Sequence, residues 1–167
     1  MTPDGKQFAF VSRGEIFVTA DEFTTTKQIT NTAAAESSPS LAPDGRTLVY
    51  CSERDGYYSL YTAKIVRKED PNFAYATLVK EERLFPEDGI ERTYPQFSPN
   101  GKEIAFIESR SVLKVLNLDT KALRQITDGV QHHGTTASKF SYQWSPDGKW
   151  FCLDLTTNGR DPYTDVG

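Results

Sequence analysis

A four-residue turn motif that recurs along the chain restricts the fold more than any other feature. In each copy Pro fixes the φ angle of the second position, Asp or Asn suits the third, and Gly takes the left-handed conformation that closes a hairpin. Each copy therefore predicts a tight turn between two antiparallel strands. The copies lie at 2–5 (TPDG), 42–45 (APDG), 98–101 (SPNG) and 145–148 (SPDG).

A run of apolar and aromatic residues follows every copy of the motif. Such a nearly continuous run predicts a strand that is buried on both faces. Three copies are also preceded by strand-like segments, SSPSLA, TYPQFS and FSYQWS. Pro39 and Pro95 lie within two of these segments. Because Pro has no N–H to donate, it predicts an edge or channel-lining strand.

The repeat extends to a unit of four antiparallel strands, because a second turn and two more strand-like segments follow the apolar run. The third residues of the turns, Asp4, Asp44, Asn100 and Asp147, are 40, 56 and 47 residues apart. Four-stranded repeats of about 40 to 50 residues are typical of β-propeller blades. The predicted fold class is all-β, a β-propeller of four-stranded antiparallel blades with almost no helix.

The longest interval contains an insertion at 67–81, between the third and fourth strands of its blade. The fourth strand of that blade is then predicted at 82–85 (ERLF). By the geometry of an antiparallel blade, the insertion projects from the side of the Pro-Asp-Gly turns. There we expect it to contact another domain.

The chain is predicted to form one partial propeller domain, 1–167, with two complete blades and two partial ones. Its first blade lacks a first strand, and its last stops after the second. We therefore expect a piece of a larger propeller. Alternatively, two chains exchange ends and close a six-bladed homodimeric ring without bare strand edges. The boundaries are 1–31 and 138–167 for the partial blades, and 36–86 and 91–128 for the complete ones.

Composition narrows the class of partner. Lys and Arg number 19 against 23 Asp and Glu, and the net charge of −4 argues against nucleic acid and anionic membranes. No apolar run approaches the length of about 20 residues that spans a bilayer. No signal peptide is recognised, so a periplasmic and a cytoplasmic location both stay open. Cys51 and Cys152 lie in apolar runs and are expected to be buried free thiols, with a disulfide as the alternative.

Catalytic and metal-binding motifs are not found. The sequence has no Gly-x-Ser-x-Gly, no His-Glu-x-x-His, no phosphate-binding glycine loop and no paired-cysteine zinc pattern. His132 and His133 are adjacent in a polar stretch, and a metal site would need a third ligand. We interpret them as loop residues and expect no metal, no cofactor and no catalysis by this chain.

Two other sets of residues have a structural and a functional interpretation. The acidic residues Asp4, Asp44 and Asp147 are interpreted as turn formers, because Asn100 holds the same place and is not an acid. Trp144 and Trp150 flank the last turn. They are expected to pack between blades, and the alternative is a stacking platform for a sugar or a peptide.

The second turns and the linkers between blades share the face opposite the Pro-Asp-Gly turns. Arg side chains on rigid loops are suited to bind a carboxylate or a peptide terminus. The alternative is that these loop charges are simply solvated. The candidate binding residues of this face are Arg54, Asp55, Arg92, Arg110, His132, His133 and Arg160.

The segments TPDGKQFAFVSRGEIFV, SPSLAPDGRTLVYCSERDGYYSLY, YPQFSPNGKEIAFIE and RQITDG resemble the TolB-type propeller repeat. That repeat occurs in TolB and in the N-terminal propellers of tricorn-like and prolyl-oligopeptidase-like proteases. The segment FSYQWSPDGKWFCLDL resembles more closely a bacterial tricorn-like protease. The resemblance implies a non-catalytic scaffold that binds protein or peptide, with any nucleophile in another domain. The alternatives are a TolB-type interaction module of the cell envelope and a propeller enzyme acting on a sugar or peptide.

Overall fold

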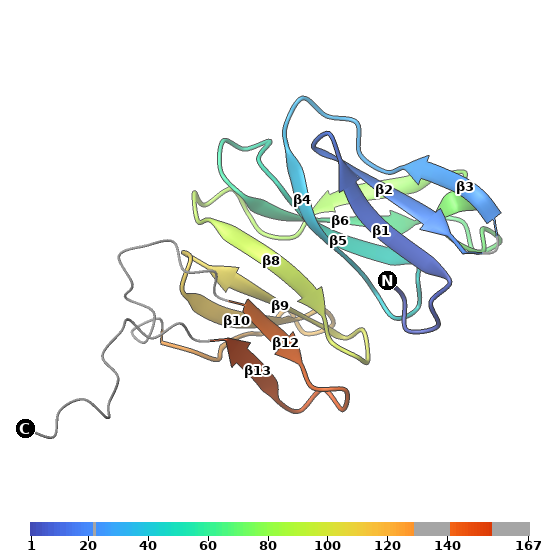
Figure 1. Cartoon of the computed structure of the whole chain (residues 1–167). Helices are drawn as coiled ribbons and strands as arrows, with labels where there is room; N and C mark the ends of the chain where they lie inside the picture. Colours follow the sequence, from blue (N-terminus) through green and yellow to red (C-terminus); the bar gives the residue numbers. More distant parts are fainter. Residues whose placement is uncertain (22, 129–140, 155–167) are drawn as a thin grey trace, which may run out of the picture.

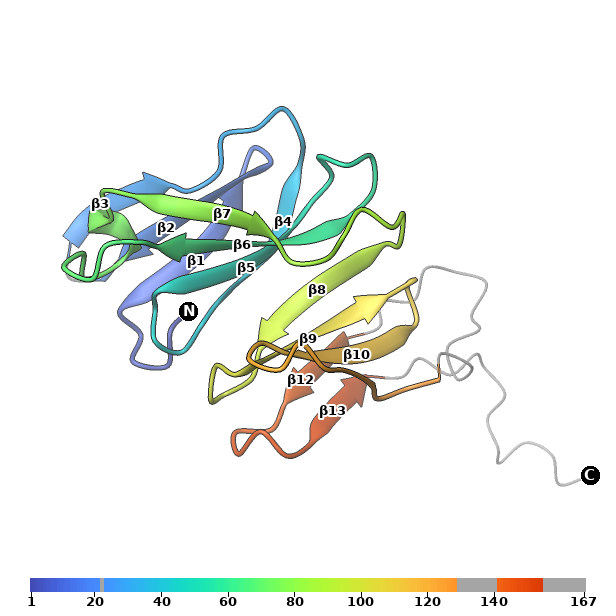
Figure 2. The same ribbon diagram turned by 180° about the vertical axis from the view of Figure 1, so that it is seen from behind.

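The computed structural model describes residues 1–21, 23–128 and 141–154. Four antiparallel sheets lie side by side and form an open arc (Figures 1 and 2). Within these ranges the one helical element is a single 3₁₀ turn, η1 (Phe73–Tyr75). The all-β prediction is therefore confirmed.

The first sheet has three strands in the order β1-β2-β3. A two-residue turn at Arg13 and Gly14, both with positive φ, joins the first two strands and matches the right-handed twist of a hairpin. Ile16 and Val18 are fully buried on one side of this sheet. Its strands are β1 (Gln7–Ser12), β2 (Glu15–Ala20) and β3 (Phe23–Gln28).

The second sheet has four strands in the order β4-β5-β6-β7. Its last strand is not at 82–85 as the sequence predicted. It begins three residues earlier, inside the predicted insertion, because Val79 pairs with Ile65 and the ladder continues from there. This outer strand is mostly exposed and polar, so it lacks the apolar pattern of a buried strand. The strands are β4 (Glu36–Leu41), β5 (Thr47–Ser52), β6 (Ser59–Ile65) and β7 (Val79–Arg83).

The third sheet has four strands and the fourth has two. Together with the first two sheets they give the predicted pattern of two complete blades between two partial ones. The third sheet contains β8 (Arg92–Phe97), β9 (Glu103–Glu108), β10 (Val112–Asn117) and β11 (Leu123–Gln125). The fourth contains β12 (Ser141–Trp144) and β13 (Phe151–Asp154).

The four Pro-Asp-Gly turns have the same internal hydrogen bonds. In the second, the N–H of Gly45 donates to the carbonyl of Ala42 over 2.9 Å, and Asp44 Oδ1 accepts the N–H of Arg46 over 2.9 Å. In the third, the amide oxygen of Asn100 accepts the N–H of Lys102 over 3.0 Å. The interpretation of these acidic residues as turn formers is confirmed, because Asn100 accepts the same backbone hydrogen bond as Asp44 does.

The first strands of the two complete blades, β4 and β8, are edge strands, and we call them the inner strands. Each has a bulge at the residue before proline. Ser38 and Tyr94 have φ angles of 51° and 53°, and the ladder to the neighbouring strand shifts register at these positions. Pro39 and Pro95 follow at once, where a missing N–H costs no ladder bond. The prediction of edge strands from these two prolines is confirmed.

The second and third sheets each pack one face on the sheet before and the other on the sheet after. Leu48 and Tyr50 of β5 contact the first sheet, whereas Val49 and Cys51 face the third. Tyr142 and Trp144 pack on the third sheet in the same manner, over Ala105, Ile107, Leu113 and Val115. This alternation explains why the second strand of each blade is apolar at nearly every position.

Two expectations about burial need correction in the last sheet. Cys51 is a buried free thiol as expected, but Cys152 is exposed, because it lies on the face of β13 that points away from the third sheet. Trp144 is 8% exposed and packs between blades, whereas Trp150 is 72% exposed. The inter-blade role is therefore confirmed for the first tryptophan and wrong for the second.

Candidate functional site

Arg54, the first of the predicted binding residues, is held by groups of its own sheet. Its guanidinium donates to Glu36 Oε1 over 3.1 Å and to Glu81 Oε2 over 2.9 Å. It also lies 4.4 Å from the centre of the Tyr61 ring. Burial opposes the charge, but the carboxylate of Glu81, with Tyr50 and Glu36, raises the pKa of Arg54. This arginine is firmly positive and already bound to two carboxylates.

Arg92 is enclosed more completely, with 5% of its side chain exposed. It donates to Glu108 over 3.1 Å and to both carboxylate oxygens of Asp88 over 3.0 and 2.8 Å. Its guanidinium lies 4.1 Å from the ring centre of Phe85. The geometry gives this residue a role in joining the linker to β8 and β9.

The remaining predicted residues differ in exposure. Asp55 pairs with Arg83 and accepts the hydroxyl of Tyr61 over 2.9 Å. Arg110 is 85% exposed at its side chain and donates through Nε to Glu91 over 3.1 Å. Of the three described arginines in this set, Arg54, Arg92 and Arg110, only Arg110 has a mostly exposed side chain. The other three, His132, His133 and Arg160, lie outside the described residues.

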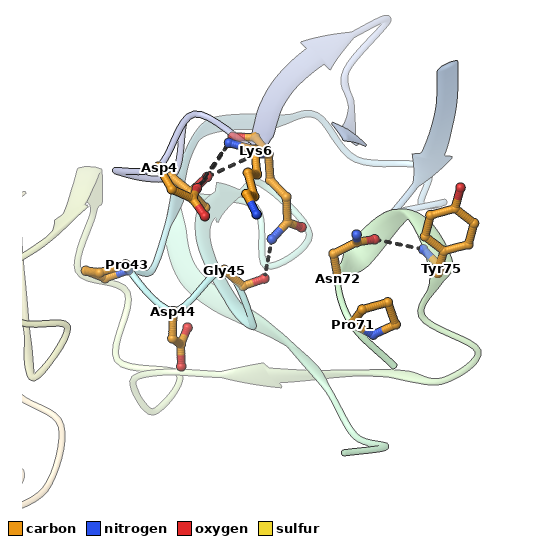
Figure 3. Close-up of a pocket in the computed structure, with 10 residues that line it drawn as sticks. Asp4, Lys6, Pro43, Asp44, Gly45, Pro71, Asn72 and Tyr75 are labelled. Atoms are coloured by element: carbon orange, nitrogen blue, oxygen red, sulfur yellow. Dashed lines mark hydrogen bonds between the residues drawn. The ribbon is translucent and has the colours of Figure 1, made fainter. Parts of the chain in front are cut away.

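A pocket of about 580 Å³ lies at the opposite end of the sheets, between the first two Pro-Asp-Gly turns (Figure 3). Asp4 and Lys6 from the first turn and Asp44 from the second line it, and Asn72 and Tyr75 from the insertion form a third wall. Hydrogen bonds from the hydroxyl of Thr2 and from the backbone N–H of Lys6 hold the pKa of Asp4 below its ordinary value.

The insertion, which forms one wall of this pocket, packs on the first sheet. The backbone N–H of Phe73 donates to Gln7 Oε1 over 3.0 Å, and Gln7 Nε2 donates to the carbonyl of Gly45 over 3.0 Å. Phe73 is fully buried among residues of the first and second sheets. The insertion projects from the predicted side, but its contacts here are with the neighbouring blade of the same chain.

A second hollow surface follows the inner strands. One hollow of about 330 Å³ is lined by Ser38, Pro39, Tyr94 and Pro95, and another of about 610 Å³ extends to Gln143 and Trp144 of β12. We call the two together the inner-strand groove. Both are lined by Met1, Ser40, Leu41 and Gln96. Within it Tyr94 is 55% exposed, so an aromatic ring is available for contact.

Within residues 1–21, 23–128 and 141–154, no group of three or more His, Cys, Asp or Glu side chains is placed to hold a metal ion. No helix within the same ranges is long and apolar enough to cross a membrane.

The repeat and the order of the strands in the sheets are those of a β-propeller. Residues 1–138 match the model of the PD40 family, described as the TolB beta propeller domain. The chain therefore belongs to this family.

Individual relatives agree with this assignment. The Tol-Pal system protein TolB of Francisella tularensis subsp. mediasiatica (strain FSC147) is 35% identical over 96 residues, which is 54% of this chain and 19% of that protein. The crystal structure of TolB from Acinetobacter baumannii has a TM-score of 0.69 at 22% identity, over 95% of this chain and 37% of that chain. This second similarity concerns the fold alone.

The predicted likeness to tricorn-like proteases receives less support. The crystal structure of the tricorn protease has a TM-score of 0.47 at 17% identity, over 69% of this chain and 10% of that chain. A likeness of this size carries no argument about the parent protein. The chain spans 19% of the length of the curated relatives it matches.

The loop arginines were predicted either to bind a carboxylate or a peptide terminus or to be solvated. Arg54 instead binds two carboxylates of its own chain, Glu36 of β4 and Glu81 of β7. No residue of the inner-strand groove was among the predicted binding residues. Its signal was present in the prolines at Pro39 and Pro95, which mark strands that leave one edge unpaired.

Proposed function

We propose that this chain is a non-catalytic protein-binding module that takes a segment of a protein partner in the inner-strand groove. The observation that carries the proposal is the groove itself, with the exposed Tyr94 in its smaller hollow and Gln96 in both hollows. Tyrosines that are held on rigid backbone and partly exposed are common anchors of protein interfaces.

The partner class follows from the relatives. The curated relatives are Tol-Pal system proteins, so the proposed module acts in the cell envelope and binds a protein component of such a system. We prefer this role in the cell envelope to a role in a tricorn-like parent, which stays a prediction. An enzyme acting on a sugar or peptide has no observation in its favour.

Binding of this chain to purified Pal, measured by biolayer interferometry, tests the proposal. Tyr94→Asn is expected to weaken binding about tenfold, since it removes an aromatic anchor while Asn tolerates the positive φ of this position. The matched control is Tyr75→Asn, which changes an exposed tyrosine beside the Pro-Asp-Gly turns. Equal loss in both variants, or no binding by the unaltered chain, would reject the groove as the binding surface.

The predicted homodimer is a further part of the proposal. Two exposed faces would be covered if two arcs closed into one ring: the face of the first sheet with Phe8, which is 50% exposed, and the face of β13 with the exposed Cys152. Light scattering across a concentration series checks it, and a constant mass of one chain would contradict a six-bladed ring of two chains.

A further inference from the structure

The pocket between the first two Pro-Asp-Gly turns lies outside the proposed function, which concerns the inner-strand groove. Its volume of about 580 Å³ is within the range of about 300–1,000 Å³ that is typical of small-molecule sites. Its walls come from two closed turns, from the start of β1 and from the insertion. We propose that this pocket binds a neutral saccharide.

Hydrogen bonds hold the walls of this pocket in place before any ligand binds. Gln7 joins all three walls, because its Nε2 donates to the carbonyl of Gly45 and its Oε1 accepts the N–H of Phe73, each over 3.0 Å. The guanidinium of Arg46 donates to the carbonyl of Asp70 over 2.6 Å and so holds the base of the insertion. A pocket with fixed walls loses little conformational entropy when a ligand enters it.

The insertion makes this pair of turns different from the next pair. Between the second and third turns, proline covers glycine, since a Cβ at Gly101 would lie 3.2 Å from Pro43 Cδ. At Gly45 the nearest side chain is instead that of Gln7, and the insertion borders the space beside it. The pocket is therefore a feature of one blade and not of the repeat, as is common for a ligand site carried on a scaffold.

The rim of the pocket presents both acceptors and donors (Figure 3). Asp4 and Asp44 each use Oδ1 to accept a backbone N–H of their own turn, over 3.1 and 2.9 Å, and this leaves the second carboxylate oxygen as an acceptor. The Oδ1 atom of Asn72 accepts the N–H of Tyr75 over 3.2 Å, so the orientation of the amide is fixed and its amino group serves as a donor. Lys6 adds an ammonium group to the same rim.

A neutral ligand with several hydroxyl groups matches this lining better than an ion does. A hydroxyl both donates and accepts, so neighbouring hydroxyls can bind the carboxylates and the amino group at once. An anion would face two carboxylates, and a cation would face Lys6. The apolar part of the lining consists of Pro43, Pro71 and the ring of Tyr75, which is 41% exposed, and it suits the C–H face of a sugar ring.

Titration of the whole chain with neutral saccharides, followed by NMR, tests the proposal. The probes are glucose, galactose, mannose, N-acetylglucosamine, maltose and cellobiose, and glycerol is the control for a non-specific polyol effect. At least one saccharide is expected to bind with a Kd of about 1–10 mM and to shift the amide signals of Gly45 and Asn72. The absence of saturable shifts with all six sugars, at concentrations well above this Kd, would overturn the proposal. Tighter binding of 1,4-diaminobutane or of inorganic phosphate would assign the pocket to an ion and also overturn it.

A matched pair of variants tests whether the saccharide binds at this pocket. Asp44→Asn removes a charged acceptor and keeps the turn, because Asn100 holds the same place in the third turn. It is expected to weaken saccharide binding about tenfold. The control is Asp147→Asn, the same change in the fourth turn, which is expected to bind as the unaltered chain does. Equal weakening in both variants would overturn the proposal.

Tyr75→Asn distinguishes this proposal from the proposed function. It removes the ring from the pocket and keeps the backbone N–H that Asn72 accepts, and it is expected to weaken saccharide binding about fivefold to tenfold without loss of Pal binding. Tyr94→Asn is expected to show the opposite pattern. Unchanged saccharide binding in Tyr75→Asn would overturn the pocket as the site. Failure of Pal to bind, with saccharide binding intact, would reject only the proposed function.

Discussion

The second and third sheets share their register and their bulge, but they hold opposite charges at the same place. Glu36 opens β4 and Arg92 opens β8, and the two residues are 2% and 4% exposed. Glu36 is bound by Arg54 from the turn after β5, whereas Arg92 is bound by Glu108 at the end of β9. The repeat therefore specifies a buried ion pair at this position and leaves its polarity free.

This difference explains why arginines were poor indicators of a ligand site. A buried charge is expensive unless it is paired, so a blade that buries Glu36 must supply a cation from its own loops. A blade that buries Arg92 must supply a carboxylate instead. The charge of each loop is therefore opposite to that of the residue that the inner strand buries. Substitutions that break one ion pair at a time test this comparison.

Removal of the guanidinium in the third sheet is expected to have the largest effect. Arg92→Leu leaves Asp88 without this cation and Glu108 with Lys114 alone, and loss of one member of a buried pair costs about 3–5 kcal/mol of unfolding free energy. Urea unfolding followed by tryptophan fluorescence measures it. The control is Arg110→Leu, which breaks an exposed pair and is expected to change stability by about 0.5 kcal/mol or less. Similar effects of the two changes would contradict the assignment.

The corresponding change in the second sheet is expected to cost less. Arg54→Leu should lower the free energy of unfolding by about 2–3 kcal/mol, because the hydroxyls of Thr32 and Ser52 still donate to Glu36. Adding Glu36→Gln should recover about half of the loss, since no uncompensated charge then remains. The two variants are compared by urea unfolding. Additive losses, without recovery, would show that the pair is not the source of the effect.

The contact between the insertion and the first sheet is a second difference between the two complete blades. Gln7→Leu leaves the buried N–H of Phe73 and the carbonyl of Gly45 without their partner, at a cost of about 1–2 kcal/mol. Thermal unfolding and exchange of the Phe73 amide report the loss. Gln28→Leu, at an exposed site of β3, is the control and should be close to neutral. Faster exchange at Phe73 in both variants would count against the tie.

The sequence predicted the repeating parts of the molecule well because each relies on local chemistry. Pro, Asp or Asn, and Gly define the turn by themselves, and Pro39 and Pro95 define edge strands through a missing donor. The strand β7 was misplaced because it faces solvent and its residues are polar. Its position depends on pairing with β6, which no local pattern shows.

The site was less predictable than the fold, because it depends on partners that are distant in the chain. Glu81 lies 27 residues after Arg54 and still accepts its hydrogen bond. Gln7 lies 66 residues before Phe73. Such pairs are brought together by the packing of whole sheets, so charge and exposure at these positions follow only once the arc is assembled.

Acidification should loosen the insertion of the second sheet before it affects the third, which has only a short turn at that place. The backbone N–H and hydroxyl of Thr77 donate to Asp70 and hold the pKa of its carboxyl below the ordinary value of 3.8. A lowered pKa in the folded chain means that this stabilisation is complete above the ordinary value and is lost as the pH falls through the folded one.

Exchange of the Thr77 amide between pH 5 and pH 2.5 measures this effect. Faster opening is expected at the acid end, after correction for the intrinsic rate. The variant Asp70→Asn should show little pH dependence, because its side chain does not titrate. A pH dependence in Asp70→Asn equal to that of the unaltered chain would assign the effect to other carboxylates.

The smallest effect concerns the two cysteines. One lies in a sheet in the middle of the arc, and the other lies in the sheet at its end. Cys51 is fully buried between the second and third sheets, and burial raises the pKa of its thiol to about 12. Cys152 is exposed on β13. Since the thiolate is the reactive form, a disulfide reagent should modify one thiol per chain in the native state and two in urea. Cys152→Ser should abolish the native reaction with no loss of stability. Rapid reaction of Cys51 in that variant would mean that the second and third sheets separate readily, and the middle of the arc would then be as open as its end.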